Sequence, residues 1–476
     1  MTYSPAEQEK RIHFLGANVD LCDLRSIYRL ACTLRGEGNG LSCPAKEDGT
    51  GALEGINIPR LDVLYLNAGI GGWIGIPWIP AIWGCITGLP ESITYWKWLI
   101  FPERGATVKP QASYLNGGRV EKVQEKPKQE ERIERLERVS SIPSGRMSED
   151  EPPLGEVFCA NVFGHYLLTH ELMPLLSTSR GGRVEGERGR IIWISTLEPQ
   201  PTDLPMNDLQ GLTSKNPYYG SKRLTDLLGL TAKLPAVRSI NSDFFHLKNY
   251  ALPHNPIFST TSKLEDEQEI AEVEDKQQRP EMYVAQPGVV NTNISGINMF
   301  ASMFMLIGFY LARWMGQVWF PIKAYPGAVA PVWLGLADQS LLDNLETCPD
   351  TPPVSRDGSG EEGSVSSHGD HYDGGITSDI VQAKCKWGSS TDRCGNERVR
   401  KTEVPGWGWS GRVGEKIDKA GRGSHAVDLT REAREDFEGD GRYAWTYMEG
   451  LRRGWEQRLQ VGDAMRKTER RRSDDR

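Results

Sequence analysis

Arg190-Ile191-Ile192-Trp193-Ile194-Ser195-Thr196 (RIIWIST) decides the fold. Its central residues are apolar on both faces, which is typical of a strand buried within a parallel sheet. Two more short apolar runs, Leu61–Leu66 and Met282–Ala285, have the same character. Apolar residues recur at helical spacing between these strands, over Val157–Leu176 and Tyr219–Leu230, so helices are predicted to alternate with strands. The expected fold class is therefore α/β, a doubly wound, Rossmann-like parallel sheet.

The whole chain is predicted to divide into three parts after its first ten residues. Residues 11–336 form the α/β domain, which begins with a predicted strand at Ile12–Asp20 and a helix from Leu24, and carries a charged insertion at about 103–150. Residues 337–430 are of low complexity and are expected to be largely disordered, because the stretch from 350 to 375 is rich in Ser, Gly, Pro, Asp and Glu. Residues 431–476 are predicted to be a helix that docks on the domain, followed by a basic tail.

Composition narrows the function classes. The 476 residues carry a formal net charge of -8, which gives no general electrostatic reason to bind nucleic acid or anionic lipid. The eight cysteines form no CxxC pair and no histidine lies at metal-ligand spacing, so no metal site is predicted. The N-terminal ten residues are polar and lack the apolar core of a signal peptide, so a cytosol-facing protein is expected.

Tyr218-Tyr219-Gly220-Ser221-Lys222 is the strongest chemical signal. It places the phenol of Tyr218 and the ammonium of Lys222 four residues apart on one helix face. A nearby cation stabilises phenolate, so we expect it to lower the Tyr218 pKa and to help the hydroxyl donate a proton to a carbonyl oxygen. Taken alone, the same spacing also describes an ordinary surface pair.

Context favours the chemical interpretation. Ser195 and Thr196 follow the buried strand, and ligands of open α/β sheets bind at the carboxyl ends of strands, where a hydroxyl can polarise a carbonyl. Hydroxyls that merely close a strand end are the alternative. Asn161 lies within an otherwise apolar helix, where its amide needs hydrogen-bond partners, so both a structural and a catalytic role are open for it.

These features occur in the order found in the short-chain dehydrogenases/reductases, and the chain resembles that family. Finer strings resemble its 3-keto-steroid reductase branch, over roughly residues 11–336. The strings are Leu64–Gly72 (LYLNAGIGG), the aromatic segment that follows, Ile192–Glu198 (IWISTLE) and Tyr218–Asp226 (YYGSKRLTD). The resemblance implies an NADPH-dependent reduction of a sterol 3-ketone to the 3β-alcohol in the C4 demethylation of ergosterol biosynthesis.

The resemblance also implies a role for each matching residue. Tyr218 would donate the proton, and Lys222 would lower its pKa and hold the nicotinamide ribose. Ser195 or Thr196 would orient the ketone, and Asn161 would order a relay water. The residues that would contact the cofactor, besides Tyr218 and Lys222, are Asp20 at the adenine, Asn67, Ala68 and Gly69 along the cleft, and Pro287, Gly288, Val289 and Thr292 at the carboxamide and phosphates.

The chain departs from the family pattern at its front. The family begins with a strand and a T-G-x-x-x-G-x-G turn whose backbone N–H groups bind the pyrophosphate, and no such pattern precedes Arg11. The sequence therefore predicts an N-terminally truncated fold that binds NADPH weakly or not at all and has little reductase activity as it stands. Two alternatives follow: a catalytically impaired interaction protein of the sterol C4-demethylation complex, and a reductase of another hydrophobic ketone.

Two apolar segments bear on location. Trp73–Phe101 is rich in tryptophan but is interrupted by prolines, and Met299–Leu311 is too short to cross a bilayer comfortably. They are expected either to pack in the core and substrate loop or to insert monotopically into one membrane leaflet. The resemblance implies the cytosolic face of the endoplasmic reticulum or of lipid droplets, and contact with other enzymes of sterol biosynthesis.

Overall fold

A computed structural model gives the fold. It describes residues 15–36, 41–43, 53–56, 58–73, 77, 79–80, 83–84, 87–88, 107–111, 151–177, 188–197, 199–245, 279–291, 299–347, 354–355, 384–415, 421–422 and 426–474.

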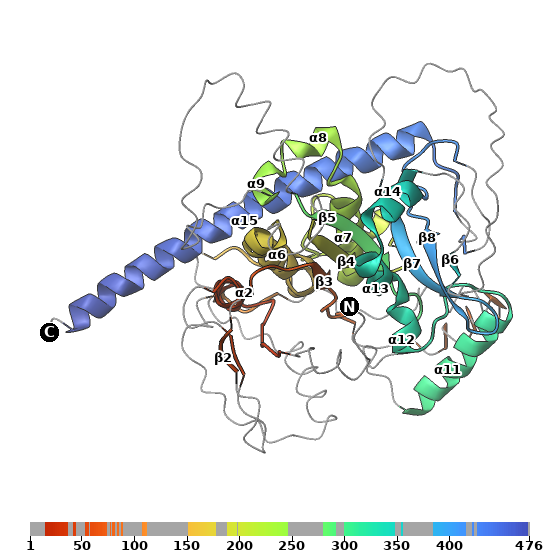
Figure 1. The fold of residues 1–476 in the computed structure, drawn as a ribbon, viewed down its shortest axis with the longest axis horizontal. Helices are drawn as coiled ribbons and strands as arrows, with labels where there is room; N and C mark the ends of the chain where they lie inside the picture. Colours follow the sequence, from red (N-terminus) through yellow and green to blue (C-terminus); the bar gives the residue numbers. More distant parts are fainter. Residues whose placement is uncertain are drawn as a thin grey trace, which may run out of the picture.

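A six-stranded mixed sheet with the order β3-β4-β5-β7-β8-β6 forms the centre of the described molecule (Figure 1). Four strands run parallel: β3 (Val63–Leu66), β4 (Arg190–Ile194), β5 (Glu281–Gln286) and β7 (Lys386–Thr391). The antiparallel strands β8 (Glu397–Thr402) and β6 (Val354–Ser355) extend the sheet beyond β7. Arg190 lies opposite both Val63 and Glu281, so the carboxyl ends of β3, β4 and β5 meet at one edge. A separate antiparallel pair joins β1 (Leu41–Cys43) and β2 (Leu53–Ile56).

Helices cover both faces of this sheet, which confirms the predicted doubly wound α/β class, with a mixed rather than purely parallel sheet. Ile191 and Trp193 of β4 pack into the core under one set of helices, and Ile192 and Ile194 pack into the core on the other side. The first set is α2 (Leu24–Leu34), α5 (Glu156–Phe158), η2 (Cys159–Phe163), α6 (Gly164–Leu176), α7 (Pro217–Thr231), α8 (Pro235–Arg238), α9 (Ser242–Phe245) and α15 (Arg431–Asp474). The second includes α13 (Val329–Leu336) and α14 (Gln339–Thr347), with α12 (Ala324–Gly327) just before them.

Local sequence explains why α7 begins where the site needs it. The side chain of Asn216 accepts a hydrogen bond from the backbone N–H of Tyr219, and Pro217 occupies the first helical turn, where its missing N–H costs nothing. Gly229 lets the helix approach the sheet closely, because a Cβ there would lie 2.2 Å from Cγ2 of Val284. The short η3 helix (Pro201–Asp203) connects β4 toward α7.

The C-terminal helix confirms the predicted docking. α15 crosses the molecule beside α7 and continues beyond the domain toward the C-terminus (Figure 1). Phe437, Trp445 and Met448 are buried in the larger core, so this helix completes the cover over α6 and α7.

The predicted strand at Ile12–Asp20 is wrong for its described part. Residues 15–20 form no strand, and among the described residues β3 pairs only with β4. The segment after them packs on η2 and α6 instead: the carbonyl of Leu21 accepts a hydrogen bond from Sγ of Cys159, 3.4 Å away. Gly164 makes room for this contact, since a Cβ there would lie 2.5 Å from that carbonyl oxygen.

The expectation that residues 337–430 are largely disordered also needs correction, because α14, β7 and β8 lie within this range. The composition led to a wrong prediction of disorder because β7 (KWGSST) is polar yet fully buried. Its hydroxyl and ammonium groups have partners: the hydroxyls of Ser389, Ser390 and Thr391 donate to backbone carbonyls, and Lys386 pairs with Asp226. Buried polar groups satisfied in this way cost little, so a polar strand can occupy the middle of a sheet. The domain boundaries themselves stay a prediction.

Three other expectations fall mainly outside the described residues: the charged insertion at about 103–150, the stretch from 350 to 375 apart from β6, and most of Trp73–Phe101. Within the described part of the chain, no helix combines the length and apolar character needed to cross a bilayer.

Candidate active site

The carboxyl edge of β4 brings together three of the predicted catalytic residues. The hydroxyl of Tyr218, at the start of α7, hydrogen-bonds to the side chain of Thr196, which follows β4. Nζ of Lys222 lies 5.8 Å from the centroid of the Tyr218 ring and donates a hydrogen bond to the carbonyl of Ile194 at 2.7 Å. Phenol, hydroxyl and ammonium therefore lie within one small cluster.

The two neighbouring hydroxyls have different environments. Ser195 is buried, its N–H donates to the carbonyl of Ala285, and its hydroxyl donates toward the carbonyl of Lys222 at 3.4 Å. Thr196 is half-buried and reaches Tyr218. Of the two residues that the sequence left as alternatives, Thr196 is the one beside the phenol.

Charge at the site differs from the expectation. Burial raises the pKa of Tyr218 to about 12, and the hydrogen bond from Thr196 offsets only part of that rise. Burial also lowers the pKa of Lys222 to about 8, an effect that Asp226 opposes and Lys386 reinforces. Burial therefore outweighs any lowering of the phenol pKa by Lys222, whose ammonium donates to the Ile194 carbonyl, and that lowering stays a prediction. Tyr218 is consequently a protonated phenol at neutral pH, which is the form that an acid catalyst requires.

Asn161 ties the loop after β3 to α7. Its Nδ2 donates to the carbonyl of Ile70 and to Oγ of Ser221, each at 3.0 Å, and its Oδ1 accepts the N–H of Ile70 at 2.8 Å. The residue lies in η2, a π-helical turn in which the N–H of Gly164 donates to the carbonyl of Cys159. Such turns are frequent at functional sites. The contacts give Asn161 a positioning role, and its ordering of a relay water stays a prediction.

The predicted cofactor residues flank this cluster. Asn67, Ala68 and Gly69 are exposed after β3, and Pro287, Gly288 and Val289 are half-buried after β5, on either side of β4. Gly69 lies so close to Asn161 that a Cβ would be 2.8 Å from its Oδ1. Gly288 has φ +70, a conformation that favours glycine.

The remaining cofactor residues are not brought to the cluster. Asp20 is exposed on the loop before α2, where its carboxylate accepts the N–H of Cys22 at 2.9 Å. Thr292 lies outside the described residues.

Sequence reasoning missed several residues of the site. The ring of Trp73 packs edge-on against Tyr218 with centroids 5.2 Å apart, so it covers the phenol. His165 stacks near Trp193, and burial together with the Lys222 charge lowers its pKa to about 3, so it is neutral. Asp226 and Lys386 are fully buried and lie farther from the edge of the sheet than Lys222, between α7 and β7. A buried charged residue one helical turn after Lys222 was a signal available for Asp226, whereas Lys386 lies in the range assigned to disorder.

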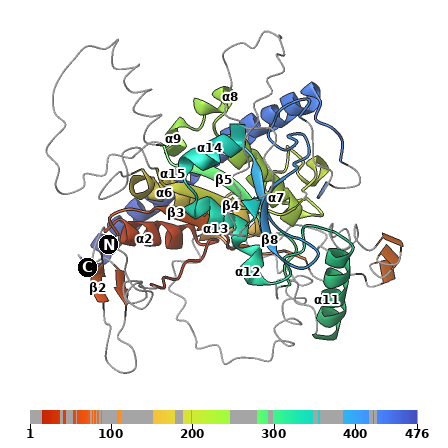
Figure 2. The same ribbon diagram turned by 45° about the vertical axis from the view of Figure 1, so that its right-hand side comes forward.

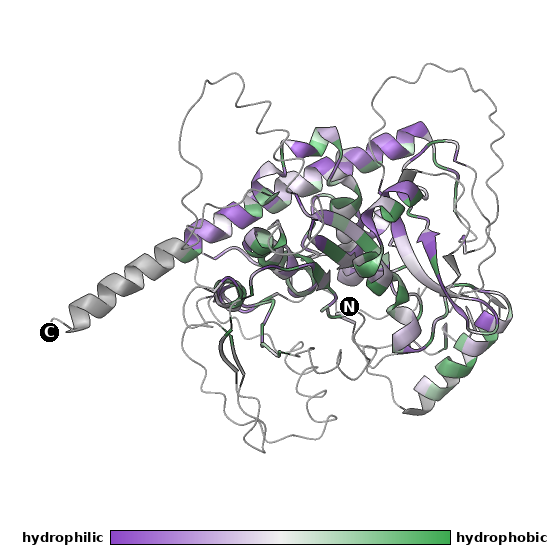
Figure 3. Cartoon of the chain, in the orientation of Figure 1, coloured by the Kyte–Doolittle hydropathy of each residue, from purple (hydrophilic) through white to green (hydrophobic). Residues whose placement is uncertain are grey.

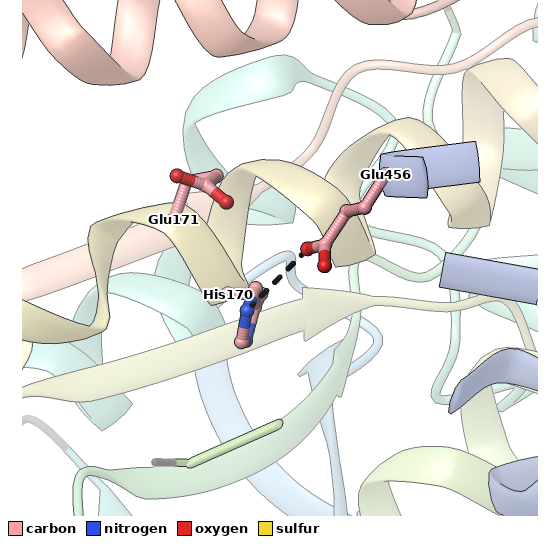
Figure 4. A group of neighbouring side chains, drawn as sticks. All are labelled: His170, Glu171 and Glu456. Carbon is pink, nitrogen blue, oxygen red and sulfur yellow. Dashed lines mark ion pairs between the residues drawn. The ribbon is translucent and has the colours of Figure 1, made fainter. Parts of the chain in front are cut away.

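A second cluster, His170, Glu171 and Glu456, has the residue types of a metal site (Figure 4). Arginines already engage it. Nε2 of His170 lies 3.1 Å from Arg452, which also pairs with Glu456 at 2.8 Å, and Glu171 pairs with Arg35 at 2.8 Å. These contacts join α6 to α15 and α2, so the cluster is an ion-pair network that anchors the C-terminal helix.

A protonated phenol beside a buried ammonium, at the carboxyl edge of a Rossmann-like sheet, defines the site of an oxidoreductase. The comparisons with known proteins make the family specific. The chain is 33% identical over 470 residues to the 3-keto-steroid reductase of Aspergillus fumigatus, covering 98% of this chain and 82% of the relative. It is 34% identical over 467 residues to that of Gibberella zeae, covering 95% and 78%.

The similarity to the reductase of Kluyveromyces lactis is 32% over 184 residues, 38% of this chain and 39% of the relative. No protein-family model matches the chain. The two long alignments show that this chain belongs to the family of fungal 3-keto-steroid reductases.

Proposed function

We propose that the protein reduces the 3-ketone of a sterol to the 3β-hydroxy sterol with NADPH, in the C4-demethylation steps of ergosterol biosynthesis. The observation that supports this most is the hydrogen-bonded pair of Tyr218 and Thr196 with Lys222 one helical turn away, in a chain similar along nearly its whole length to proteins named 3-keto-steroid reductase.

The described residues fit the nicotinamide end of such a cofactor. Residues 67–69 and 287–289 flank the end of β4, and each segment contains a glycine where a Cβ would clash with a neighbouring group. Lys222 uses one N–H on Ile194, and an ammonium has three donors, so it can also bind ribose hydroxyls. When bound, the cofactor supplies hydride.

The chain's own residues supply the proton and the orientation. Tyr218, protonated at neutral pH, donates its proton to the ketone oxygen, and the hydroxyl of Thr196 orients that oxygen beside it. Lys222 stabilises the resulting phenolate through its positive charge. Trp73 covers the phenol and limits access of water to it.

A lipid surface is the proposed location, on the cytosolic side of the endoplasmic reticulum or of lipid droplets. Helix α11 (Met299–Trp314) projects at one side of the molecule (Figure 2) and is largely apolar along its visible face (Figure 3). Its exposed apolar side chains, with that of the residue just after it, are Met303, Ile307, Tyr310, Leu311, Trp314 and Met315. Its opposite side packs through Phe309 and Ala312 on Phe320 and Ile322.

This arrangement suits one leaflet better than a span, because an apolar stripe on a docked helix can enter the interface without crossing it. Ile79 and Trp83, in the tryptophan-rich segment, are exposed as well. A sterol ketone is almost entirely confined to lipid, so a site close to such a surface receives its substrate directly. Other enzymes of sterol biosynthesis at the same membrane are the proposed partners.

A ketone panel tests the proposed activity. NADPH oxidation is followed with a 3-keto sterol, a 17-keto steroid and a long-chain aliphatic ketone, up to cofactor concentrations that saturate weak binding. We expect turnover with the 3-keto sterol alone. Turnover only with another ketone would assign a different substrate, and calorimetry that shows no NADPH binding would favour the interaction protein instead.

A further inference from the structure

The side chain of Lys222 is part of a buried row of charges that continues away from the substrate side. Asp226 follows Lys222 by four residues on α7, so the two lie on the same helix face. Oδ2 of Asp226 lies 2.8 Å from Nζ of Lys386 on β7, and both side chains are fully buried. The row therefore reads cation, anion, cation, from the site into the space between α7 and the sheet.

The Asp226 carboxylate is only partly used by Lys386. Its second oxygen, Oδ1, is buried and has no hydrogen-bond partner among the described residues. A buried carboxylate with an open oxygen is costly unless its charge balances neighbouring cations. The buried cations on which the Asp226 charge acts are Lys222, Lys386 and the adjacent Arg223, and Arg223 is also balanced by Asp440 and Asp203.

The packing holds these groups together. Lys386 lies opposite Val284 of β5, and Val284 is the residue against which Gly229 of α7 packs. The close approach at Gly229 brings the Asp226 face of the helix within reach of the Lys386 ammonium. No other charged residue of β7 among those described enters this space, since Lys386 is the one charged residue of that strand.

We propose that Asp226 and Lys386 form a positioning pair for Lys222, in which Lys386 fixes the Asp226 carboxylate and that carboxylate keeps the Lys222 ammonium charged beside Tyr218. The inference deepens the proposed function and rests on it. Asp226 and Lys386 do not touch the reacting atoms and act through Lys222.

The two members of the pair have opposite effects on the pKa of Lys222, and this difference can be measured. The Asp226 charge raises the pKa of Lys222 and the Lys386 charge lowers it. The other groups that face Lys222 are the neutral His165 from α6, the phenol of Tyr218 and the carbonyl of Ile194. Reduction needs the charged Lys222, so activity is lost as pH rises through its pKa.

The test is the pH profile of kcat with the 3-keto sterol for the unmodified chain, Asp226→Asn and Lys386→Met. We expect the alkaline limb to move to lower pH by about one unit in Asp226→Asn and to higher pH by a similar amount in Lys386→Met. A shift of this size is expected when a charge within a few ångströms of the titrating amine is removed. KM should change little. A merely structural pair would lower the amount of folded enzyme and leave the limb in place.

Lys384 offers a matched control. It is a buried lysine just before the same strand, paired with Glu346 at 2.8 Å, but it lies at the amino end of the sheet. Lys384→Met should destabilise the fold without moving the alkaline limb. A limb that moves equally in Lys384→Met and Lys386→Met would overturn the proposal.

A second measurement separates this inference from the proposed activity. Trace acetylation across pH, with mass spectrometry of the Lys222 peptide, titrates this amine without turnover. Opposite shifts in the two variants support the pair even if no ketone is reduced. Unshifted titration in an active enzyme overturns the pair alone.

If a single variant fails to fold, the double variant Asp226→Asn/Lys386→Gln replaces the ion pair by an amide pair. Because Asp226 influences Lys222 more strongly than Lys386 does, we expect the Lys222 titration to move to lower pH by less than one unit. A folded double variant whose titration equals that of the unmodified chain would contradict the proposal.

Discussion

Two buried lysines at opposite ends of the same sheet show how burial can serve chemistry or stability. Lys384, at the amino end, contacts Glu346 at 2.8 Å and Glu281 at 3.1 Å and lies over the ring of Tyr283. Burial alone would lower its pKa, but the two carboxylates raise it well above the ordinary value. Lys222, at the carboxyl end, forms no ion pair with a carboxylate among the described residues, and burial lowers its pKa to about 8.

This difference between the two lysines indicates that the carboxyl edge of the sheet carries the chemistry. A lysine paired with two carboxylates stays a cation at neutral pH, so we assign its charge to the stability of the fold. A lysine whose charge is weakly balanced responds to what binds beside it, and perturbed groups of this kind mark functional sites. The predictions below test this contrast, starting with the largest expected effect.

Removing the proton donor should have the largest effect. Tyr218→Phe keeps the ring that packs on Trp73 but removes the hydroxyl, so kcat with the 3-keto sterol should fall by about 10²–10⁴-fold. NADPH binding, measured by calorimetry, should stay within about twofold, because Lys222 and the residues after β3 and β5 are proposed to supply most of the cofactor contacts. Tyr219→Phe, the neighbouring phenol on α7, is the control and should retain most activity. Near-normal turnover of Tyr218→Phe would reject the assignment.

Removing the structural lysine should affect stability and not chemistry. Lys384→Met leaves Glu281 and Glu346 buried with less charge compensation, and breaking a buried pair in this way costs about 3–5 kcal/mol. Urea unfolding should show a lower midpoint, while kcat per folded molecule stays unchanged. Lys222→Met should show the reverse pattern, with a large loss of kcat and a smaller loss of stability. Similar patterns in both variants would remove the contrast between the two ends.

Removing each of the two hydroxyls after β4 should lower kcat by a different amount. Thr196→Val removes the partner of the Tyr218 hydroxyl, and a net hydrogen bond of about 0.5–1.5 kcal/mol corresponds to roughly a two- to tenfold loss of kcat. Ser195→Ala should change kcat less, because that hydroxyl faces the Lys222 carbonyl. Thr196→Ser should restore activity. A larger loss in Ser195→Ala than in Thr196→Val would exchange their roles.

The smallest effect on the chemistry itself is expected at α11. Ile307→Lys and Trp314→Lys place charges on its exposed apolar stripe, so the protein should shift from the membrane pellet to the supernatant in sedimentation assays. The unmodified chain should be released by detergent and poorly by high salt, since salt screens charges but leaves apolar burial intact. Val427→Lys, at an exposed apolar residue outside α11, should not alter sedimentation. Release of the unmodified chain by salt alone would argue against insertion.

Strand hydrophobicity and residue order carried most of the fold prediction. The apolar runs of β4 and β5 are buried inside the sheet, so their class and their parallel arrangement follow from the pattern alone. The run of β3 was also predicted as a strand, but β3 lies at the edge of the described sheet with Tyr65 exposed, so its predicted burial on both faces was wrong. β7 could not be found in that way, because its polar residues are satisfied by partners distant in sequence. The segment before α2 was misassigned for a related reason: its apolar residues pack on helices, and no strand pairs with it among the described residues.

In the candidate site too, local features could be predicted and features that depend on distant residues could not. Tyr218, Thr196 and Lys222 could be predicted because their order and spacing are local. The charge state could not, because it depends on the folded environment: burial raises the pKa of Tyr218, and burial and Lys386 lower the pKa of Lys222. Asn161 could be predicted as a residue that needs partners, and the structure supplies those partners in the β3 loop and α7.

The most direct measurement uses cofactor deuterated at the transferred position. The protein is incubated with this NADPH and a 3-keto sterol in lipid vesicles, and the sterol is analysed by mass spectrometry and NMR. We predict one deuterium at C3 of a 3β-hydroxy sterol for each NADPH oxidised, and almost none with Tyr218→Phe. Cofactor that binds and is oxidised without label at C3, or label that arrives equally with Tyr218→Phe, would contradict the account.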